Sequence, residues 1–206
     1  MGEDFDERAA TWDDDLERMA RARRVAAVVR SVVPLDGHPV TVELGSGTGM
    51  LARCLHDVLG PTTLLDASPA MVEVASKALA SEGLGDWSAA VADLSEGIPG
   101  GPYELALAQM FLHHVDDVPA LLRSLRRAMT PGGVVVIADL DHDAAKRYHA
   151  TAVDFHGHHG FCRDELRGWL EQAGYHDICF HDAGVVGKEV DGERQDFPMF
   201  LAVAKV

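Results

Sequence analysis

The chain has 206 residues, of which 47% are apolar and 25% are charged, and these values indicate one globular domain with a sizeable core. Its formal net charge of -15 disfavours nucleic acid and anionic membranes as partners, because an anionic surface repels both. The sequence shows no apolar run of membrane-spanning length, no signal-peptide pattern and three widely spaced cysteines. We therefore expect a cytoplasmic protein with reduced thiols.

The first expected element is a helix that follows an acidic segment. Residues 5–14, which include Trp12, are expected to form a mobile lead-in. Apolar positions then repeat with a helical period over residues 15–33, and Pro34 ends that helix. Its cluster of arginines at positions 21, 23 and 24 is expected on a solvated face.

From residue 41 onward, short apolar strands alternate with amphipathic helices, which is the pattern of a doubly wound α/β fold. Ser68 and Pro69 are typical first residues of a helix, and Gly174 is typical of a helix end. A polar loop over residues 187–195 is expected to join the last two strands as an antiparallel hairpin. The expected strands are 41–44, 62–65, 87–91, 105–109, 134–138, 175–181 and 200–206, and the expected later helices are 50–59, one that begins at 69, 118–129 and 163–173.

The most informative segment, residues 40–49, reads Val-Thr-Val-Glu-Leu-Gly-Ser-Gly-Thr-Gly and predicts a strand, a glycine-rich turn and a helix. Because Gly45, Gly47 and Gly49 lack Cβ atoms, the backbone can turn sharply and offer the free amides of the helix start to a ligand. The G-x-G-x-G spacing differs from the G-x-G-x-x-G of nicotinamide and flavin enzymes, which disfavours an NAD-dependent dehydrogenase. Glu43 instead suits a cationic amino group, such as that of the methionine part of S-adenosylmethionine.

Further polar residues follow the next strands, where ligands of doubly wound sheets bind. Asp66 ends the second strand and is placed to accept hydrogen bonds from both ribose hydroxyls. Asp93 follows the third strand and can accept from an adenine amino group while Ala92 and Leu94 enclose the ring. Gln109 ends the fourth strand and is expected near the sulfonium. Their order along the chain favours ligand binding over a set of unrelated turn formers.

These motifs resemble the class I S-adenosylmethionine-dependent methyltransferases, and specifically a bacterial small-molecule subgroup. The resemblance covers nearly the whole chain and is carried by residues 42–49, 65–71, 91–94, 110–115 and 129–133. It implies a Rossmann-like, doubly wound sheet of seven strands with the last strand antiparallel. It also implies methyl transfer from S-adenosyl-L-methionine to an oxygen or nitrogen of a small-molecule acceptor, with S-adenosyl-L-homocysteine as product.

The resemblance also implies roles for single residues. Glu43 and Gly45 would hold the methionine end of the cofactor, Asp66 and Met71 the ribose and adenine side, and Asp93 the adenine amine. The full set of expected cofactor contacts is Trp12, Glu43, Gly45, Ser46, Gly47, Gly49, Asp66, Ala67, Met71, Ala92, Asp93, Leu94 and Gln109. Residues 1–34 are expected to form a lid and a helix, and residues 35–206 the methyltransferase domain, in a monomer or homodimer.

A phenol, hydroxyl or protonated amine loses a proton when it is methylated, and histidine is the usual base near neutral pH. Histidines are concentrated after the expected fourth strand and between residues 142 and 159, both on the ligand side of the sheet. The expected catalytic residues are His113, His149, His158 and His159. Arg147 or Arg163 could hold an anionic group of the acceptor.

Three alternatives compete with this interpretation. His156, His158 and His159 could bind a metal together with Asp139 and Asp141, but metal-dependent catechol methyltransferases also use an asparagine and this chain has none, so no metal is expected. The same fold could use S-adenosylmethionine for cyclisation or aminopropyl transfer. The chain could also be a non-catalytic cofactor-binding partner subunit, although its intact glycines and acids argue against this.

Overall fold

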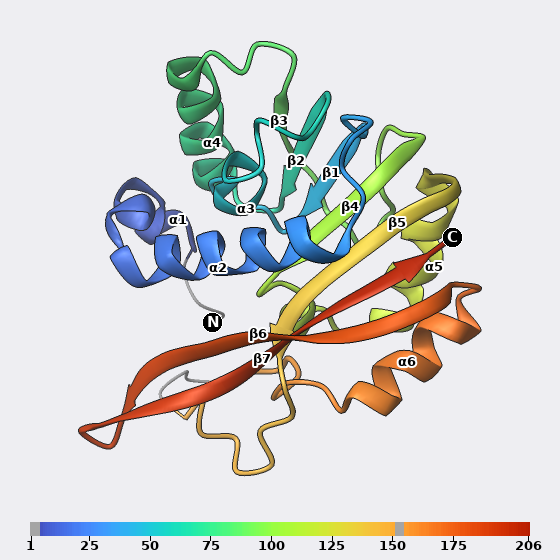
Figure 1. Cartoon of the computed structure of the whole chain (residues 1–206). Coiled ribbons are helices and arrows are strands. Elements are labelled where there is room, and N and C mark those ends of the chain that lie inside the picture. The colour runs from blue at the N-terminus through green and yellow to red at the C-terminus, as the bar shows by residue number, and fades with distance from the viewer. Residues whose placement is uncertain (1–4, 151–154) are drawn as a thin grey trace.

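The structure, a computed structural model, describes residues 5–150 and 155–206 and contains one seven-stranded sheet of order β3-β2-β1-β4-β5-β7-β6 (Figure 1). Strands β1 to β5 pair in parallel, whereas β7 runs antiparallel to both β5 and β6. The expected Rossmann-like α/β sheet with an antiparallel last strand is therefore confirmed. The strands are β1 Thr41–Leu44, β2 Thr62–Asp66, β3 Ser88–Val91, β4 Tyr103–Gln109, β5 Met129–Leu140, β6 His176–Val190 and β7 Glu193–Lys205.

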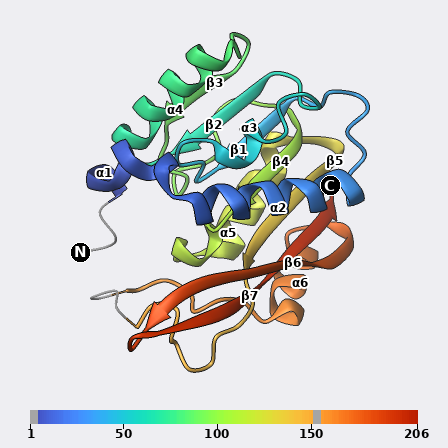
Figure 2. The ribbon, with the colours of Figure 1, turned by 60° about the vertical axis from the view of Figure 1, so that its left-hand side comes forward.

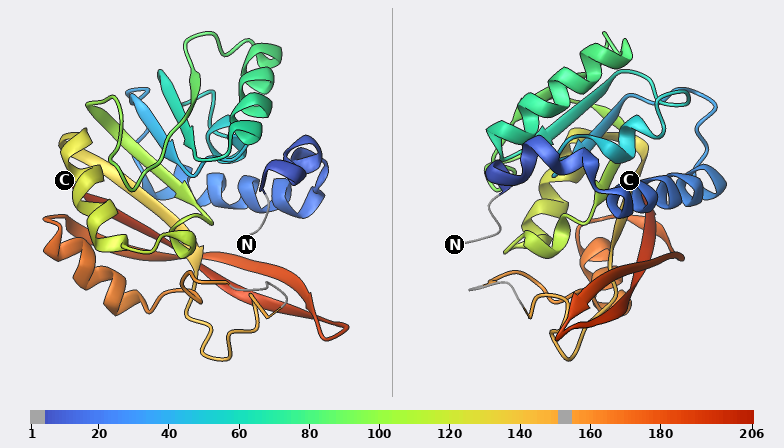
Figure 3. Two further views of the ribbon diagram at one scale, coloured as in Figure 1. Left: turned by 180° about the vertical axis from the view of Figure 1, so that it is seen from behind. Right: turned by 90° about the vertical axis from the view of Figure 1, so that its left-hand side faces the viewer.

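Helices cover both faces of the sheet, as Figures 1 and 3 show. Val25 of α2 and Leu79 of α4 belong to one buried cluster, and Leu122 of α5 and Leu166 of α6 belong to the other. Successive residues of β5 alternate between the two clusters, as expected for a strand that is buried on both sides. The helices are α1 Phe5–Arg8, η1 Ala9–Asp14, α2 Leu16–Val32, α3 Met50–Arg53, α4 Pro69–Glu82, η2 Leu112–His114, α5 Val118–Ala128 and α6 Arg163–Gln172.

The segment before α2 is helical, so the expectation of a mobile lead-in over residues 5–14 is wrong. Figure 2 shows α1 beside α4, and contacts of η1 with α4 continue this packing. Side-chain hydrogen bonds hold the segment in place: Asp6 accepts from the Ser68 hydroxyl, and Asp13 accepts from the Thr48 hydroxyl at 2.6 Å. Asp6 and Asp13 thus accept hydrogen bonds from the turns that follow β2 and β1, respectively.

The helix after β1 is shorter than expected: α3 ends at Arg53, and residues 54–58 form turns. The Arg30 guanidinium donates to the Cys54 carbonyl at 3.0 Å, and the His56 ring lies 2.9 Å from the Arg53 carbonyl. Leu55 bonds to the Ala52 carbonyl, three residues back. Side chains therefore compete for the carbonyls that a longer helix would use.

The final hairpin is longer than expected, since β6 reaches Val190 and β7 begins at Glu193. The connection is the dipeptide Asp191-Gly192, in which both residues have positive φ angles of 55° and 80°. This is the geometry of a two-residue type I′ turn, which matches the twist of paired strands. The outer end of the hairpin projects beyond the other strands (Figure 3). The expected loop over residues 187–195 is therefore mostly strand.

Two smaller points complete the fold. The segment 130–133, expected as a turn, is assigned to β5, whose pairing with β4 shifts register near Tyr103. In the described parts of the chain, no helix is long and apolar enough to cross a membrane.

We predict that Gly49→Ala destabilises the fold more than Gly83→Ala. Both glycines have left-handed φ angles, 78° and 74°, but a Cβ at Gly49 would lie 2.4 Å from Cδ1 of buried Leu64, whereas nothing lies within 4 Å of a Cβ at Gly83. Because overpacking adds to the backbone penalty, we expect Gly49→Ala to lose about 1–3 kcal/mol more of unfolding free energy. Urea denaturation measures this difference, and equal losses in the two variants would contradict the packing argument.

Candidate active site

A cleft of about 680 Å³ lies at the carboxyl ends of β1, β2 and β4, and we call it the larger cleft. Of the predicted cofactor contacts, Gly49 alone does not line it; instead, Gly49 packs on Leu64 at the start of α3. The predicted residues that line it are Trp12, Glu43, Gly45, Ser46, Gly47, Asp66, Ala67, Met71, Ala92, Asp93, Leu94 and Gln109.

The glycine-rich turn has the backbone that its sequence requires. Gly45 and Gly47 have φ angles of 57° and 54°, in the left-handed region that favours glycine. A Cβ at Gly45 would lie 2.0 Å from Cδ2 of Phe111, so the ring of Phe111 packs directly on this residue. A Cβ at Gly47 would instead point toward Trp12 and Met71, both of which line the cleft.

Asp66 fixes this turn through both of its carboxylate oxygens. Oδ2 accepts from the Gly47 amide at 2.7 Å, and Oδ1 accepts from the Ser68 amide at 2.9 Å. Each carboxylate oxygen has more than one lone pair, so Asp66 can still accept from a ligand in the cleft. The expectation that amides at the helix start are free is wrong for several of them. The Gly47 amide donates to Asp66, the Ala52 amide donates to Glu43, and the Ser46 and Gly49 amides donate to backbone carbonyls.

Two uncharged side chains of the cleft, Ser46 and Gln109, have a polar atom without a partner among the described residues. The hydroxyl oxygen of Ser46 and Oε1 of Gln109 are buried and make no hydrogen bond within the described residues. Buried polar atoms in folded proteins are nearly always hydrogen-bonded, so unsatisfied ones need an explanation. Both residues line the larger cleft, and a polar ligand there would satisfy them.

Glu43 lies at the floor of the cleft and is 3% exposed. Burial raises the pKa of its carboxyl to about 8, although the hydrogen bond from the Ala52 amide acts in the opposite direction. The side chain is therefore largely protonated at neutral pH in the ligand-free protein. A cationic group bound beside it would favour the ionised form.

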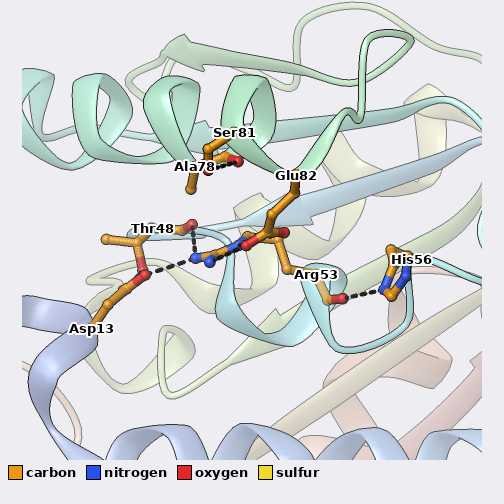
Figure 4. Close-up of polar contacts among 7 residues, drawn as sticks. All are labelled: Asp13, Thr48, Arg53, His56, Ala78, Ser81 and Glu82. Carbon is orange, nitrogen blue, oxygen red and sulfur yellow. Dashed lines mark hydrogen bonds and ion pairs between the residues drawn. The ribbon is translucent and has the colours of Figure 1, made fainter.

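A network of side chains joins the N-terminal segment to the turn after β1 (Figure 4). Arg53 donates to Asp13 at 2.7 Å and to Glu82 at 3.0 Å. Because Asp13 also accepts from Thr48, one carboxylate connects η1 to both α3 and the glycine-rich turn. The network places Trp12, the residue before Asp13, over the larger cleft.

Trp12 forms part of the wall that separates the larger cleft from a second cavity. The guanidinium of Arg18 lies 3.6 Å from the centroid of the indole ring, and the Phe5 ring meets it edge-on at 5.8 Å. The second cavity has a volume of about 480 Å³, and we call it the smaller cavity. The two spaces share the lining residues Phe5, Trp12, Arg18, Arg21, Met110 and His114.

Three histidines line the smaller cavity, and only His113 has a carboxylate partner there. Nδ1 of His113 lies 2.7 Å from Oδ1 of Asp139, and both side chains are buried. Burial acts to raise the pKa of Asp139, but contact with His113 holds that pKa below its usual value. Burial lowers the pKa of His114 to about 4 and that of His149 to about 3. The last two rings are therefore neutral at physiological pH.

His149 and the later histidines differ in position. His149 stacks on Phe155 with ring centroids 3.6 Å apart, and neither of its ring nitrogens has a partner in the described residues. His158 packs near Phe161, and neither His158 nor His159 is among the described residues that line the two cavities. The expected catalytic set is thus divided into His113 and His149, which line the cavity, and two neighbours that do not: the His158 amide donates to the His113 carbonyl, and the His159 ring lies 5.4 Å from that of His149.

The proposed metal ligands are engaged elsewhere. Asp139 contacts His113, and Asp141 accepts two hydrogen bonds from Arg163 at 2.7 and 2.6 Å. Over residues 5–150 and 155–206, no group of three histidine, cysteine or acidic side chains could hold a metal ion. Arg163 is thus paired with Asp141, and Arg147 contacts Asp191. Neither of these two arginines, which were expected to bind an anion, is among the described residues that line the smaller cavity.

Sequence reasoning missed the residues that α2 contributes. All three arginines were expected on a solvated face, and Arg23 and Arg24 are exposed, but Arg21 is half-buried and both Arg21 and Arg24 line the smaller cavity. Met110 follows Gln109 at the end of β4, has a φ of 53° and lines both spaces. The helical period of α2 indicates which residues share a face. It does not indicate that β6, which lies far along the chain, packs against α2.

Comparison with known proteins identifies the family. A family described as methyltransferase domain matches residues 7–179. The chain belongs to the class I S-adenosylmethionine-dependent methyltransferases. This methyltransferase is 32% identical over 143 residues to the biotin biosynthesis bifunctional protein BioCD of Bordetella avium (strain 197N). The aligned residues cover 67% of this chain and 28% of that protein.

Two further proteins resemble this methyltransferase. The trans-aconitate 2-methyltransferase of Azoarcus sp. (strain BH72) is 31% identical over 131 residues, which cover 62% of this chain and 50% of that protein. The chain thus spans half or less of the length of these curated relatives. The structure of phosphoethanolamine N-methyltransferase 2 of Haemonchus contortus with S-adenosyl-L-methionine has a TM-score of 0.71 at 17% identity, covers 88% of this chain and 51% of that chain, and shows a shared fold.

We predict that Glu43 makes the methyltransferase less stable as pH rises from 4.5 to 8. Over this interval the unfolded chain carries an ionised glutamate, whereas the folded chain keeps the side chain protonated because its pKa is raised to about 8. The loss is on the order of 1 kcal/mol per pH unit and saturates above pH 8. Glu43→Gln, whose amide oxygen can still accept from Ala52, should remove it.

Urea denaturation of both proteins at pH 5, 6.5 and 8 measures the effect. The stability advantage of Glu43→Gln should grow with pH across this series. An advantage that stays constant would mean that Glu43 is ionised in the folded protein.

Proposed function

We propose that this methyltransferase binds S-adenosylmethionine in the larger cleft and methylates an oxygen or nitrogen of a small molecule in the smaller cavity. The observation that carries the proposal is the wall shared by the two spaces, which allows two ligands to meet at Trp12, Met110 and His114. When bound, S-adenosylmethionine supplies an electrophilic methyl group on a cationic sulfur.

The residues of the larger cleft fit this cofactor. Asp66, which binds the Gly47 amide, has acceptor capacity for ribose hydroxyls, and Asp93 has an exposed carboxylate for an adenine amine. The unsatisfied atoms of Ser46 and Gln109 add hydrogen-bonding positions near the ends of β1 and β4. Glu43 would give up its proton beside a cationic amino group, so cofactor affinity should increase as pH rises.

His113 is the residue that we propose as general base. Asp139 contacts Nδ1, which fixes the ring and leaves Nε2 to receive a proton from the acceptor. His149 and His114 are poorer bases because burial lowers the pKa of each ring well below neutrality, and they would position the acceptor instead. Roles in catalysis for His158 and His159 have no support from the described lining of the smaller cavity.

The N-terminal segment would exclude water from the reaction. Phe5 and Trp12 line both spaces, and Asp13 holds the segment against Thr48 and Arg53. A closed, dry site protects a reactive methyl donor from side reactions. The division into a lid over residues 1–34 and a methyltransferase domain over 35–206 stays a prediction, and so does a state of monomer or homodimer.

Cofactor binding is tested by isothermal titration calorimetry with two matched variants. Asp93 and Glu96 are both exposed acids after β3, but Asp93 lines the larger cleft and Glu96 does not. We predict that Asp93→Ala weakens binding of both S-adenosylmethionine and S-adenosylhomocysteine by about tenfold, because a charged acceptor for the adenine amine is lost. Glu96→Ala should bind as the unchanged protein does.

Two outcomes would count against the proposal. Absence of binding at millimolar cofactor would favour a non-catalytic scaffold. Release of methylthioadenosine, in place of S-adenosylhomocysteine, from a metabolite screen would show a different use of the cofactor.

We predict that His113→Asn lowers kcat by about 10²–10⁴-fold with an acceptor found in that screen, because the general base is lost. Asparagine can still donate to Asp139, so the buried carboxylate keeps a partner and cofactor affinity should not change. His176→Asn, at the exposed start of β6, is the control and should retain full activity. A kcat for His113→Asn that stays close to that of the unchanged protein would exclude His113 as the base.

A further inference from the structure

The two spaces differ in charge. Five acidic and two arginine side chains line the larger cleft, whereas six arginine or lysine and two acidic side chains line the smaller cavity. This basic surface is unexpected in a chain whose formal net charge is -15. The cations of the smaller cavity are Arg8, Arg18, Arg21, Arg24, Lys188 and Arg194.

Several of these cations have partners within the protein. Arg194 pairs with Glu17 at 2.7 Å, and Arg18 pairs with Asp15 at 3.0 Å while it covers Trp12. Arg24 donates to the Val185 carbonyl at 2.7 Å. These contacts build the wall of the cavity, and they use the two acids, Asp15 and Glu17, that line it.

Arg21 differs, because it has no acceptor among the described residues. Its Nε atom is buried and makes no hydrogen bond, and no carboxylate forms an ion pair with its guanidinium over residues 5–150 and 155–206. The titratable groups whose charges act on it are Tyr148, Asp15, Arg24 and Asp139. Burial lowers the pKa of the guanidinium, although both acids oppose this.

The two acids near Arg21 are already engaged. Asp15 accepts from two backbone amides at the start of α2 and pairs with Arg18, and Asp139 contacts His113. Arg21 is half-buried, and its Nε is a buried donor without an acceptor among the described residues, which needs an explanation. Arg21 lines both spaces, which places this cation where a cofactor and an acceptor would meet.

We propose that the methyl acceptor carries an oxyanion, either a carboxylate or a phosphate, which binds Arg21 at the junction of the two cavities. The planar guanidinium presents paired N–H donors that match two oxygens of either group. Arg24 and Lys188, which line the same cavity, add positive potential around that position. This inference rests on the proposed function and names the class of its acceptor.

The position of His113 further limits the chemical class of the methyl acceptor. His113 and Arg21 line the same cavity, so one acceptor can contact both. An anion on Arg21 and a hydroxyl or amine that loses its proton to His113 are then separate groups of one molecule. The acceptor is therefore a small acid with a second, protonated nucleophile, such as a hydroxy acid or a phenolic acid.

The test measures anion binding without cofactor. Sodium malonate and inorganic phosphate are titrated against sodium chloride of equal ionic strength, with thermal denaturation and calorimetry as readouts. We expect a saturable rise of the melting temperature with at least one of the two anions, and the one that binds distinguishes a carboxylate from a phosphate acceptor. In Arg21→Met the dissociation constant of that anion should rise at least tenfold.

The control lies on the same helix. Arg23 is exposed, two residues from Arg21, and lines neither space, so Arg23→Met should bind anions as the unchanged protein does. Arg21→Lys keeps the charge but loses the paired donors, so its dissociation constant for the anion should lie between those of wild type and Arg21→Met. It replaces Arg21→Met in the comparison if the methionine variant does not fold. Absence of saturable binding, or equal binding by all four proteins, would overturn the proposal.

Calorimetry with S-adenosylmethionine on the same preparations separates this inference from the proposed function. If the cofactor binds and neither anion does, the anionic acceptor is excluded while the methyltransferase function stands. If the cofactor does not bind, the proposed function itself fails.

Discussion

The carboxylate of Asp66 is the interaction on which the candidate site depends. It accepts one backbone amide from the turn after β1 and one from the turn after β2, so two neighbouring strand ends are joined by a single side chain. This bridge holds Gly47 in its left-handed conformation beside Trp12 and Met71, which line the larger cleft with it. The site therefore does not rely on a long helix: α3 has only four residues, and its Ala52 amide is taken by Glu43.

Most of the fold could be predicted because its signals are local. The β-branched strand before Gly45, the cap formed by Ser68 and the buried run of β5 each specify their own element, and the structure has all three. The extension of β6 and β7 was missed because its outer part carries polar residues that resemble a loop. The dipeptide Asp191-Gly192 is a strong hairpin signal by itself and could have corrected the boundary.

The candidate site could be predicted where it follows strand ends and not where it depends on distant packing. Twelve of the thirteen expected cofactor contacts line the larger cleft, and all of these except Trp12, which lies in η1, are at or after the ends of β1 to β4. Gly49 is the exception because its glycine requirement comes from contact with Leu64. Arg21 could not be recognised, since the segment that encloses it lies about 160 residues later, as the contact of Arg24 with Val185 shows.

The long hairpin has an evolutionary consequence. Val185, Val186 and Lys188 line the smaller cavity from the part of β6 whose partners in β7 lie beyond the residues that pair with β5. The glycine-rich turn and Asp66, by contrast, sit at the centre of the sheet. A mutation at exposed Val185 can therefore change the lining of the proposed acceptor cavity while the buried cluster that contains Val186 stays intact, which offers descendants of this chain a route to altered specificity at little cost in foldability.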